Sequence, residues 1–238
     1  MALHRLADEG FRDVAAAYDR GRPDYPREVL DVLGIPAGAR VLDLAAGTGK
    51  LTRVLRAGGY EVVPVEPQPA MRALVDGAFD GTAEAIPLAD ASVDAATIAD
   101  AWHWFDHERA VAELARVVRP GGVVAIMWQY PTGEDVPDWA HKLGEILDPL
   151  RGDHPGLSTE MRLPDDFPGF EGREERSVPF LYEADRERYL AFLSSISIVA
   201  ALPADERAEV MRRVGEVVPD GTFALRYRTL AMLSRRRG

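Results

Sequence analysis

The chain has 238 residues, of which 47% are hydrophobic and 28% are charged, and it contains no cysteine. Disulfides, thiolate metal ligands and a cysteine nucleophile are therefore excluded. The formal net charge of -11 at pH 7 would repel a phosphate backbone, which disfavours a nucleic-acid partner.

The apolar runs of the chain are short. The longest of them, such as VVAIMW and SIVAAL, are far below the ~20 residues that a membrane-spanning helix needs. Charged residues interrupt the first residues, MALHRLADEGF, so no secretory signal is predicted. We expect a cytoplasmic protein with no membrane partner, as a monomer or a homodimer.

Two helices are predicted before the first strand. The segment FRDVAAAYDRG places Phe11, Val14, Ala15 and Tyr18 on one side of a helix. The turn-forming residues RPDYP follow, and PREVLDVLG then predicts a second helix that ends at Gly34.

From residue 39 to residue 129, strands and helices are predicted to alternate. Strands are indicated by the apolar runs ARVLDLA, YEVVPVE, SVDAATIAD and GVVAIMWQ, with a short additional strand in FDGTAEAIP between the second and third of these. Helices are indicated by GKLTRVLRAGG, PAMRALVDGA and DHERAVAELARVVRPGG. This alternation predicts crossover connections and a parallel sheet that helices cover on both faces.

The remainder of the chain follows a different pattern. Residues 130–180 are rich in proline, glycine and charge, with one helix at PDWAHKLGEIL, and are expected to form a variable insertion. A sixth strand is predicted in REERSVPFLYEAD and a closing strand in TFALRYRTLAML, with helices between them. We therefore predict a single α/β domain over residues 1–238. Its Rossmann-like sheet would have seven mostly parallel strands, the last of them antiparallel.

The Gly-rich turn VLDLAAGTGKLT follows the first predicted strand, and three kinds of nucleotide site compete for it. A Walker A loop fails because Leu44 occupies a required glycine position and Leu51 follows Lys50 in place of a serine or threonine. A dinucleotide fingerprint fits only in part, because Thr52 occupies the position of its third glycine. Lys50 is then expected to face solvent in the first turn of the helix.

The third candidate ligand is S-adenosylmethionine. Such a turn needs an acidic residue at the end of the strand, supplied by Asp43, and small residues after it, supplied by Ala45, Ala46, Gly47 and Gly49. The ligand carries a sulfonium cation, so a nearby carboxylate is electrostatically favourable. No pyrophosphate has to be bound, and a third glycine is not required.

Acidic residues also follow the next two predicted strands. Glu66 ends the second strand, roughly 20 residues beyond the turn, where a carboxylate can accept hydrogen bonds from both ribose hydroxyls, as it also does in NAD enzymes. Glu84 follows the third strand and could face an adenine edge. Each acid alone could be a solvated loop residue, but acids at three successive strand ends favour an adenosine-containing ligand.

Taken together, these segments resemble the class I, seven-stranded S-adenosylmethionine-dependent methyltransferases. The resemblance extends from about residue 11 to residue 128 and rests on VLDLAAGTGKLT, VEPQPAM, AEAIPLADASVDAATIADAWHWF and RVVRPGGVVAIMW, in that order. The segments FRDVAAAYDRGRPDYP and AWHWF further resemble the small-molecule branch that includes trans-aconitate methyltransferase-like proteins. The resemblance implies S-adenosylmethionine as cofactor, S-adenosylhomocysteine as product and a small-molecule acceptor. No metal is expected, because no cluster of histidine, aspartate and glutamate has the spacing of a metal site and methyl transfer does not require one.

The resemblance also implies positions for the cofactor. Asp43, Ala45 and Gly47 would contact the methionine part, and Glu66 would bind the ribose. The adenine would lie near Pro67, Met71, Ala83 and Glu84. Asp100 and Ala101 would close the pocket after the fourth strand. Two positions depart from the family pattern. Ala45 occupies the usual first glycine, and Thr82 stands where many relatives carry an acid, which leaves Glu84 as its substitute.

The segment AWHWF follows the fourth predicted strand. We expect Trp102, His103 and Trp104 to face an acceptor pocket together with Trp128. The alternative is that the tryptophans pack as core. His103 is the candidate general base, needed only when the acceptor arrives protonated, and otherwise a structural hydrogen-bonding residue. Asp106 is the expected N-cap of the next helix.

The segment before the first strand carries three further candidate pocket residues, Tyr18, Arg22 and Tyr25. In the resembling proteins such segments cover the cofactor and the substrate, which would exclude water. The alternative is a helix that only packs on the sheet. The predicted parts are a helical lid over 1–38, a cofactor-binding core over 39–129, a substrate-side insertion over 130–180, and helices with the closing strand over 181–238.

The sequence thus predicts an enzyme that transfers a methyl group to a carboxylate, hydroxyl or amine of a small molecule. One alternative is a catalytically silent protein that only binds S-adenosylmethionine. Another is an NAD-dependent oxidoreductase, which Thr52 disfavours.

Overall fold

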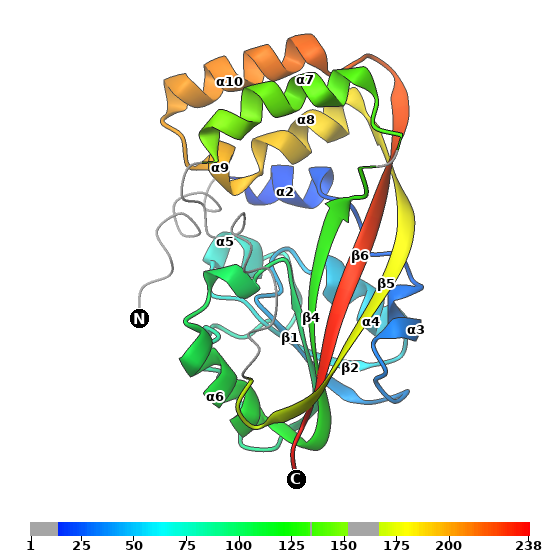
Figure 1. The fold of residues 1–238 in the computed structure, drawn as a ribbon. Helices are drawn as coiled ribbons and strands as arrows, with labels where there is room; N and C mark the ends of the chain where they lie inside the picture. The colour runs from blue at the N-terminus through cyan, green and yellow to red at the C-terminus, as the bar shows by residue number, and fades with distance from the viewer. Residues whose placement is uncertain (1–13, 134, 152–166) are drawn as a thin grey trace.

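The strands form one mixed sheet with the order β2-β1-β3-β4-β6-β5 (Figure 1). The computed structural model describes residues 14–133, 135–151 and 167–238, so Phe11 of the predicted first helix lies outside the described residues. The strands are β1 (Arg40–Leu44), β2 (Glu61–Val65), β3 (Val93–Ala99), β4 (Val118–Pro131), β5 (Phe170–Asp185) and β6 (Thr222–Arg236). The first four strands in this order are parallel, and β6 is antiparallel to both β4 and β5. The predicted antiparallel closing strand is therefore confirmed.

The prediction of seven strands is wrong, because the described residues form a sheet of six. The segment FDGTAEAIP forms only two isolated bridges, Val65 with Phe79 and Thr82 with Ala85. At Gly81 the chain folds back so tightly that a Cβ atom would lie 2.5 Å from Pro87 Cδ. Aspartate and glycine are also poor strand residues, so this segment turns instead of extending.

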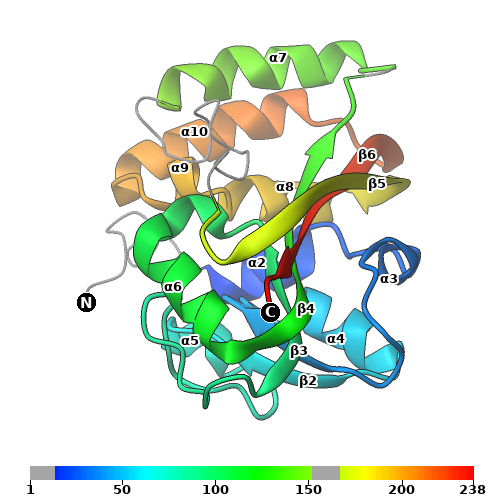
Figure 2. The same cartoon turned by 60° about the horizontal axis from the view of Figure 1, so that its bottom comes forward.

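Helices cover both faces of the sheet, as predicted. The helices α3 (Val29–Val32) and α4 (Lys50–Ala57) pack on one face, and α5 (Pro69–Arg72) and α6 (His107–Val117) lie on the other (Figures 1 and 2). Successive residues of a strand point to opposite faces. Thus Val41 packs with α4, whereas Leu42 and Leu44 pack with α6.

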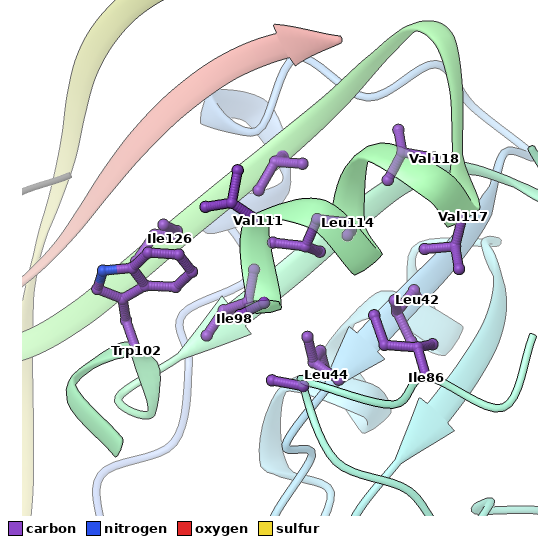
Figure 3. Close-up of a cluster of buried hydrophobic side chains, with 14 of the residues drawn as sticks. Leu42, Leu44, Ile86, Ile98, Trp102, Val111, Leu114, Val117, Val118 and Ile126 are labelled. Atoms are coloured by element: carbon purple, nitrogen blue, oxygen red, sulfur yellow. The ribbon is translucent and has the colours of Figure 1, made fainter. Parts of the chain in front are cut away.

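The buried cluster beneath α6 is called here the α6-side core (Figure 3). Leu114 and Val117 of α6 meet Ile98 of β3 and Ile126 of β4 in it, all fully buried. Asp106 accepts a hydrogen bond from Arg109 N at 3.3 Å and is the N-cap of α6, as predicted.

A layer of helices lies above the carboxyl ends of the parallel strands (Figure 1). It consists of α7 (Asp138–Leu147), α8 (Arg186–Ser194), α9 (Ser197–Ala200) and α10 (Ala204–Val217), with the short helix α2 (Ala15–Gly21) packed under α8. The upper halves of β5 and β6 extend into this layer, where Tyr182 and Tyr227 are buried with Tyr189 of α8. In the described part of the chain, no helix is both long enough and apolar enough to cross a membrane.

The contact between α2 and α8 depends on Gly21. A Cβ atom at this position would lie 2.1 Å from the backbone nitrogen of Phe192, so only glycine allows the two helices to approach so closely. The hydroxyl of Tyr182 donates a hydrogen bond to the carbonyl of Gly21. The N-terminal segment is thereby fixed between the sheet and the helical layer.

Candidate active site

A cavity lies at the carboxyl ends of β1 and β3, beneath the N-terminal segment. Its walls are Tyr18, Arg22, Pro23, Tyr25, Asp43, Ala45, Ala46, Gly47, Thr48, Lys50, Leu51, Ala99, Asp100, Gln129, Pro131, Phe192 and Tyr227. The structure thus brings together the predicted methionine-side residues and the three aromatic and basic residues predicted on the N-terminal segment. Ligands of open α/β sheets bind at this edge, which makes the cavity the candidate site.

The Gly-rich turn at the base of the cavity is held in an unusual backbone conformation. Ala45, Gly47 and Gly49 have φ angles of 57°, 59° and 81°, in the left-handed region that favours glycine. Ala45, at the position of the usual family glycine, adopts this conformation without being one. The backbone N–H of Ala46 donates to Val65 O at 3.0 Å, which joins the turn to β2.

Glu66 connects the end of β2 to the same turn. Its Oε2 accepts a hydrogen bond from Gly47 N at 2.8 Å, and its Oε1 accepts one from Gln68 N at 2.8 Å. Burial raises the pKa of this carboxyl group, which is only 4% exposed. A carboxylate has about four lone-pair sites, so each oxygen keeps one to accept a ligand hydroxyl.

Asp43 is buried at the end of β1, with 1% of its surface exposed. Its carboxylate accepts hydrogen bonds from Thr52 Oγ1 at 2.5 Å and from Thr97 Oγ1 at 3.3 Å. Burial raises its pKa to about 6, although these hydroxyls favour the charged form. Thr52, which replaces the third glycine of a dinucleotide fingerprint, therefore fixes Asp43 in place.

Asp100 closes the cavity from the end of β3. Its φ angle of 52° is strained for a residue other than glycine. The hydroxyl of Tyr25 donates to Oδ2 at 2.8 Å, and Gln129 N donates to Oδ1 at 3.0 Å. Burial raises the pKa of both Asp100 and Tyr25. The N-terminal segment is thus hydrogen-bonded directly to the cavity wall.

Lys50 does not face solvent, so that prediction is wrong. It is 8% exposed, and its Nζ pairs with Asp24 of the N-terminal segment at 2.6 Å. Arg188 of α8 pairs with the other oxygen of Asp24 at 3.0 Å. Because Asp24 lies 26 residues away in the sequence, the helical pattern around Lys50 contained no sign of this contact.

Of the predicted adenine-side residues, Pro67 and Met71 lie at or next to α5, whereas Ala83 belongs to the α6-side core and Glu84 lies beside the start of α6. Met71 and Ala83 are buried, and the Sδ of Met71 lies 4.0 Å from the place of a Cβ on Gly47. The carbonyl of Pro67 accepts a hydrogen bond from Arg72 at 2.8 Å. Glu84 accepts a hydrogen bond from the backbone N–H of Asp106 at 2.9 Å, which connects it to the start of α6.

The predicted acceptor-side tryptophans occupy a different place. Trp102 is 1% exposed in the α6-side core, where it stacks on His107 at 4.7 Å, and Trp128 is 3% exposed in the same core. Trp104 packs against that core. The rings of His103 and Trp104 lie side by side, with their centroids 4.6 Å apart. None of these four residues, nor the buried Ala101, is among the described residues that line the cavity.

Several wall residues could not be found from the sequence. Phe192 of α8 and Tyr227 of β6 reach the cavity from parts of the chain that carry no ligand motif. In the sequence, Gln129 is recognisable only as the last residue of a predicted strand.

Among the residues that the structure describes, no group of three histidine, aspartate or glutamate side chains could hold a metal ion.

Comparisons with known proteins identify relatives over most of the chain. Residues 42–126 match the family model described as a methyltransferase domain. An uncharacterized methyltransferase of Mycobacterium tuberculosis is 38% identical over 218 residues, which are 87% of this chain and 85% of the relative. A demethylmenaquinone methyltransferase of Thermus thermophilus is 38% identical over 116 residues, 43% of this chain and 53% of the relative. The solved structure of a candidate type II methyltransferase from Anaeromyxobacter dehalogenans has a TM-score of 0.64 and 29% identity, covering 91% of this chain and 97% of that one.

Proposed function

Because the chain belongs to the class I S-adenosylmethionine-dependent methyltransferases, we propose that it methylates a small molecule through the cavity above β1 and β3. The observation that carries this proposal is the Glu66 carboxylate, which is hydrogen-bonded to Gly47 of the turn and keeps free lone pairs. The family and the fold imply S-adenosylmethionine as the methyl donor.

The charges around the cavity fit an amino-acid tail. Arg22 is half-buried, and its Nε is enclosed without an acceptor in the described part of the chain. Its Nη2 makes a long contact with Ser195 O at 3.5 Å. We infer that Arg22 binds the carboxylate of the methionine part, and that Asp100 faces its ammonium group. Ala45 and Gly47 would lie against the same part.

The ribose and adenine would extend from this cavity toward α5. Glu66 would accept the ribose hydroxyls, with Pro67, Met71, Ala83 and Glu84 around the adenine. When bound, the cofactor supplies a methyl group on a sulfonium, which is a good leaving group. The residues of this chain then hold and align the reactants, and alignment alone supplies much of the acceleration of such a displacement.

Removal of a proton is the remaining chemical task when the acceptor is a hydroxyl or an amine. His103, in the short helix η1 (Trp102–Trp104) directly after β3, is the proposed base. A carboxylate acceptor would need no base. The proposal that this chain belongs to the trans-aconitate methyltransferase-like branch rests on the AWHWF segment and on the residues before β1.

A small-molecule acceptor is supported by the relative from Thermus thermophilus, which is named for demethylmenaquinone. The proposed division of the chain also fits such an acceptor. Residues 1–38 would cover the cofactor-binding core of 39–129, residues 130–180 would form the substrate side, and 181–238 would complete the domain. The hydrogen bond from Tyr25 to Asp100 supports the covering role of the N-terminal segment.

Calorimetric titration tests the proposal. The chain should bind S-adenosylhomocysteine and not NAD, and labelled methyl groups should pass from S-adenosylmethionine to a molecule in a metabolite extract. Glu66→Ala should weaken S-adenosylhomocysteine binding by roughly tenfold or more, because hydrogen bonds to a carboxylate are lost. Glu61→Ala, on the same strand but exposed, is the matched control and should bind normally. Preference for NAD, or equal binding by both variants, would refute the proposal.

A further inference from the structure

The hydroxyl group of Tyr227 has no hydrogen-bond partner at the cavity above β1 and β3. Tyr227 of β6 lines this cavity and is 5% exposed. Its hydroxyl bonds to no residue in the described part of the chain, and burial raises its pKa, so that it stays protonated as a donor. By contrast, the hydroxyls of Tyr25 and Tyr182 donate to Asp100 and to Gly21 O. Buried polar groups are paired in the great majority of cases, so the Tyr227 hydroxyl is expected to meet a ligand.

The register of the sheet places Gln129 beside Tyr227. Pro131 of β4 pairs with Tyr227 of β6, and Gln129 pairs with Thr229. Residues directly opposite in an antiparallel ladder share a face, and so do residues two apart along a strand. Gln129 is therefore a diagonal neighbour of Tyr227 at about 7–8 Å, a separation that long side chains can bridge. Figure 1 shows β4 and β6 side by side up to the helical layer.

Gln129 and Tyr227 lie on the face of the sheet that α4 covers. Met127 of β4, two residues before Gln129, belongs to the buried cluster beneath α4. Trp128, between them, points to the other face and into the α6-side core. This alternation explains why Gln129 and Tyr227 line the cavity, whereas Trp128 does not.

This pair lies at the end of the cavity away from the proposed ribose site. Glu66, which would bind the ribose, follows β2, and the proposed contacts of the methionine part follow β1 and β3. In the order β2-β1-β3-β4-β6, the strand of Tyr227 is four strand spacings of about 4.8 Å from β2. The part of the cavity next to β4 and β6 is therefore left for the methyl acceptor.

The charged residues of the cavity wall are already engaged. Lys50 pairs with Asp24, and Asp43 accepts hydrogen bonds from two threonine hydroxyls. Arg22 and Asp100 would bind the carboxylate and the ammonium group of the methionine part. Among the described wall residues, no charge then remains to pair with a charged acceptor. An unpaired charge is costly to bury, so this end of the cavity favours an uncharged molecule.

We propose that Tyr227 and Gln129 bind the hydroxyl group of an uncharged aromatic methyl acceptor. The proposal rests on the proposed function, since it names the class of molecule that this methyltransferase would take. A hydroxyl group both accepts and donates. Tyr227 would donate to its oxygen, and the amide oxygen of Gln129, to which no described residue donates, would accept its proton. Tyr18, Pro131 and Phe192 line the same cavity and would contact the aromatic ring.

The test uses the full chain saturated with S-adenosylhomocysteine. Titration followed by NMR would compare phenol and benzyl alcohol with benzoate and benzylamine, which have the same ring but carry a charge. In the wild-type protein, phenol or benzyl alcohol should bind roughly tenfold or more tightly than either charged compound, because a buried charge without a partner is penalised. Tyr227→Phe keeps the ring but removes the hydroxyl, and should weaken this binding by about three- to tenfold.

Tyr189→Phe is the matched control. Tyr189 is 6% exposed and packs with Tyr182 in the helical layer, but it is not among the described residues that line the cavity. This variant should bind phenol and benzyl alcohol as the wild type does. Both variants should keep the wild-type affinity for S-adenosylhomocysteine, which also shows that they are folded.

Three results would overturn the proposal. The first is that neither phenol nor benzyl alcohol binds, or that a charged compound binds as tightly. The second is an equal effect of Tyr227→Phe and Tyr189→Phe. The third is a Tyr227→Phe protein that is folded by circular dichroism but loses affinity for S-adenosylhomocysteine, because Tyr227 would then bind the methionine part. If the wild-type chain binds no S-adenosylhomocysteine, the proposed function itself fails.

Discussion

The carboxylate of Glu66 accepts a hydrogen bond from the backbone N–H of Gly47 at 2.8 Å, so the end of β2 holds the turn that follows β1. The turn contains two residues, separated by Ala46, with nearly equal φ angles, 57° at Ala45 and 59° at Gly47. Only Gly47 has the residue type that this conformation favours. Ala45 therefore carries backbone strain in the turn that would contact the cofactor.

The substitutions Ala45→Gly and Gly47→Ala should have opposite effects on stability. A left-handed conformation costs an L-residue about 1–2 kcal/mol, and glycine costs about 0.4–1 kcal/mol in the unfolded state. We expect Ala45→Gly to be neutral or up to about 1 kcal/mol more stable, and Gly47→Ala to be about 1 kcal/mol less stable. A Cβ on Gly47 meets only Met71 Sδ at 4.0 Å, so strain and not collision would cause the loss. Denaturant unfolding of both variants measures the difference, and losses of equal size would contradict it.

The titration of Asp43 should make stability depend on pH. Burial raises its pKa from 3.8 to about 6, so the folded chain holds this proton more tightly than the unfolded chain. The resulting stabilisation is complete below about pH 4 and is lost as pH rises through about 6. A shift of about two units corresponds to about 3 kcal/mol. The test compares the free energy of unfolding of the wild type with that of Asp43→Asn. The difference between the two (wild type minus variant) should fall by about 3 kcal/mol as the pH rises from about 4 to about 7.

The difference between the two proteins isolates Asp43. Glu66 and Asp100 also have pKa values raised by burial, but they are present in both proteins and their contributions cancel. Urea unfolding at half-unit pH steps would give both curves. Parallel curves over this range would mean that the Asp43 carboxyl group titrates alike in the folded and unfolded chains.

The sequence was most informative where a segment carries its own periodicity. The apolar runs ending at Leu44 and Val65 and the amphipathic pattern of α6 each depend on local residues, and they were predicted correctly. The prediction of a seventh strand was wrong, because the pairing of Phe79 with Val65 stops after one bridge. A single turn of the chain at Gly81, which no local pattern shows, decided this.

The candidate site was less predictable, because it is built from distant segments. The contact of Tyr182 with Gly21 joins residues 161 positions apart, and it places α2 over the cavity. The position of Trp102 was ambiguous for another reason. An aromatic residue after a strand has the same sequence signature whether it lines a pocket or fills a core, and only packing around His107 distinguished the two.

Gly21→Ala should separate α2 from α8. The new methyl carbon would lie 2.1 Å from the backbone nitrogen of Phe192, and backbone atoms cannot give way as a flexible side chain can. We expect a loss of about 1–3 kcal/mol or more in the free energy of unfolding. Hydrogen exchange should also become faster in α2. Gly144→Ala, inside α7 with Asp148 Oδ2 at 3.6 Å, is the control and should be neutral or slightly stabilising. Equal stability of the two variants would show that the helices can shift at no cost.

The pair formed by Lys50 and Asp24 should be energetically coupled more strongly than a surface ion pair. The Lys50 side chain is 8% exposed, and removing the Asp24 charge by Asp24→Asn would leave a buried cation unpaired. A double-mutant cycle with Lys50→Met should therefore give a coupling free energy of about 1–2 kcal/mol. This is less than for a fully buried ion pair, because the Asp24 side chain is 61% exposed. The same cycle on Arg212 and Glu209, which are 57% and 56% exposed, should give less than about 1 kcal/mol.

Salt should distinguish the two pairs as well. The surface pair on α10 is open to screening, whereas the enclosed Nζ of Lys50 is shielded from counterions. Raising the ionic strength from about 0.01 M to 1 M should therefore remove most of the coupling between Arg212 and Glu209 and retain most of that between Lys50 and Asp24. If both couplings vanish together, Lys50 exchanges with solvent in solution and the N-terminal segment is not fixed to α4 by this contact.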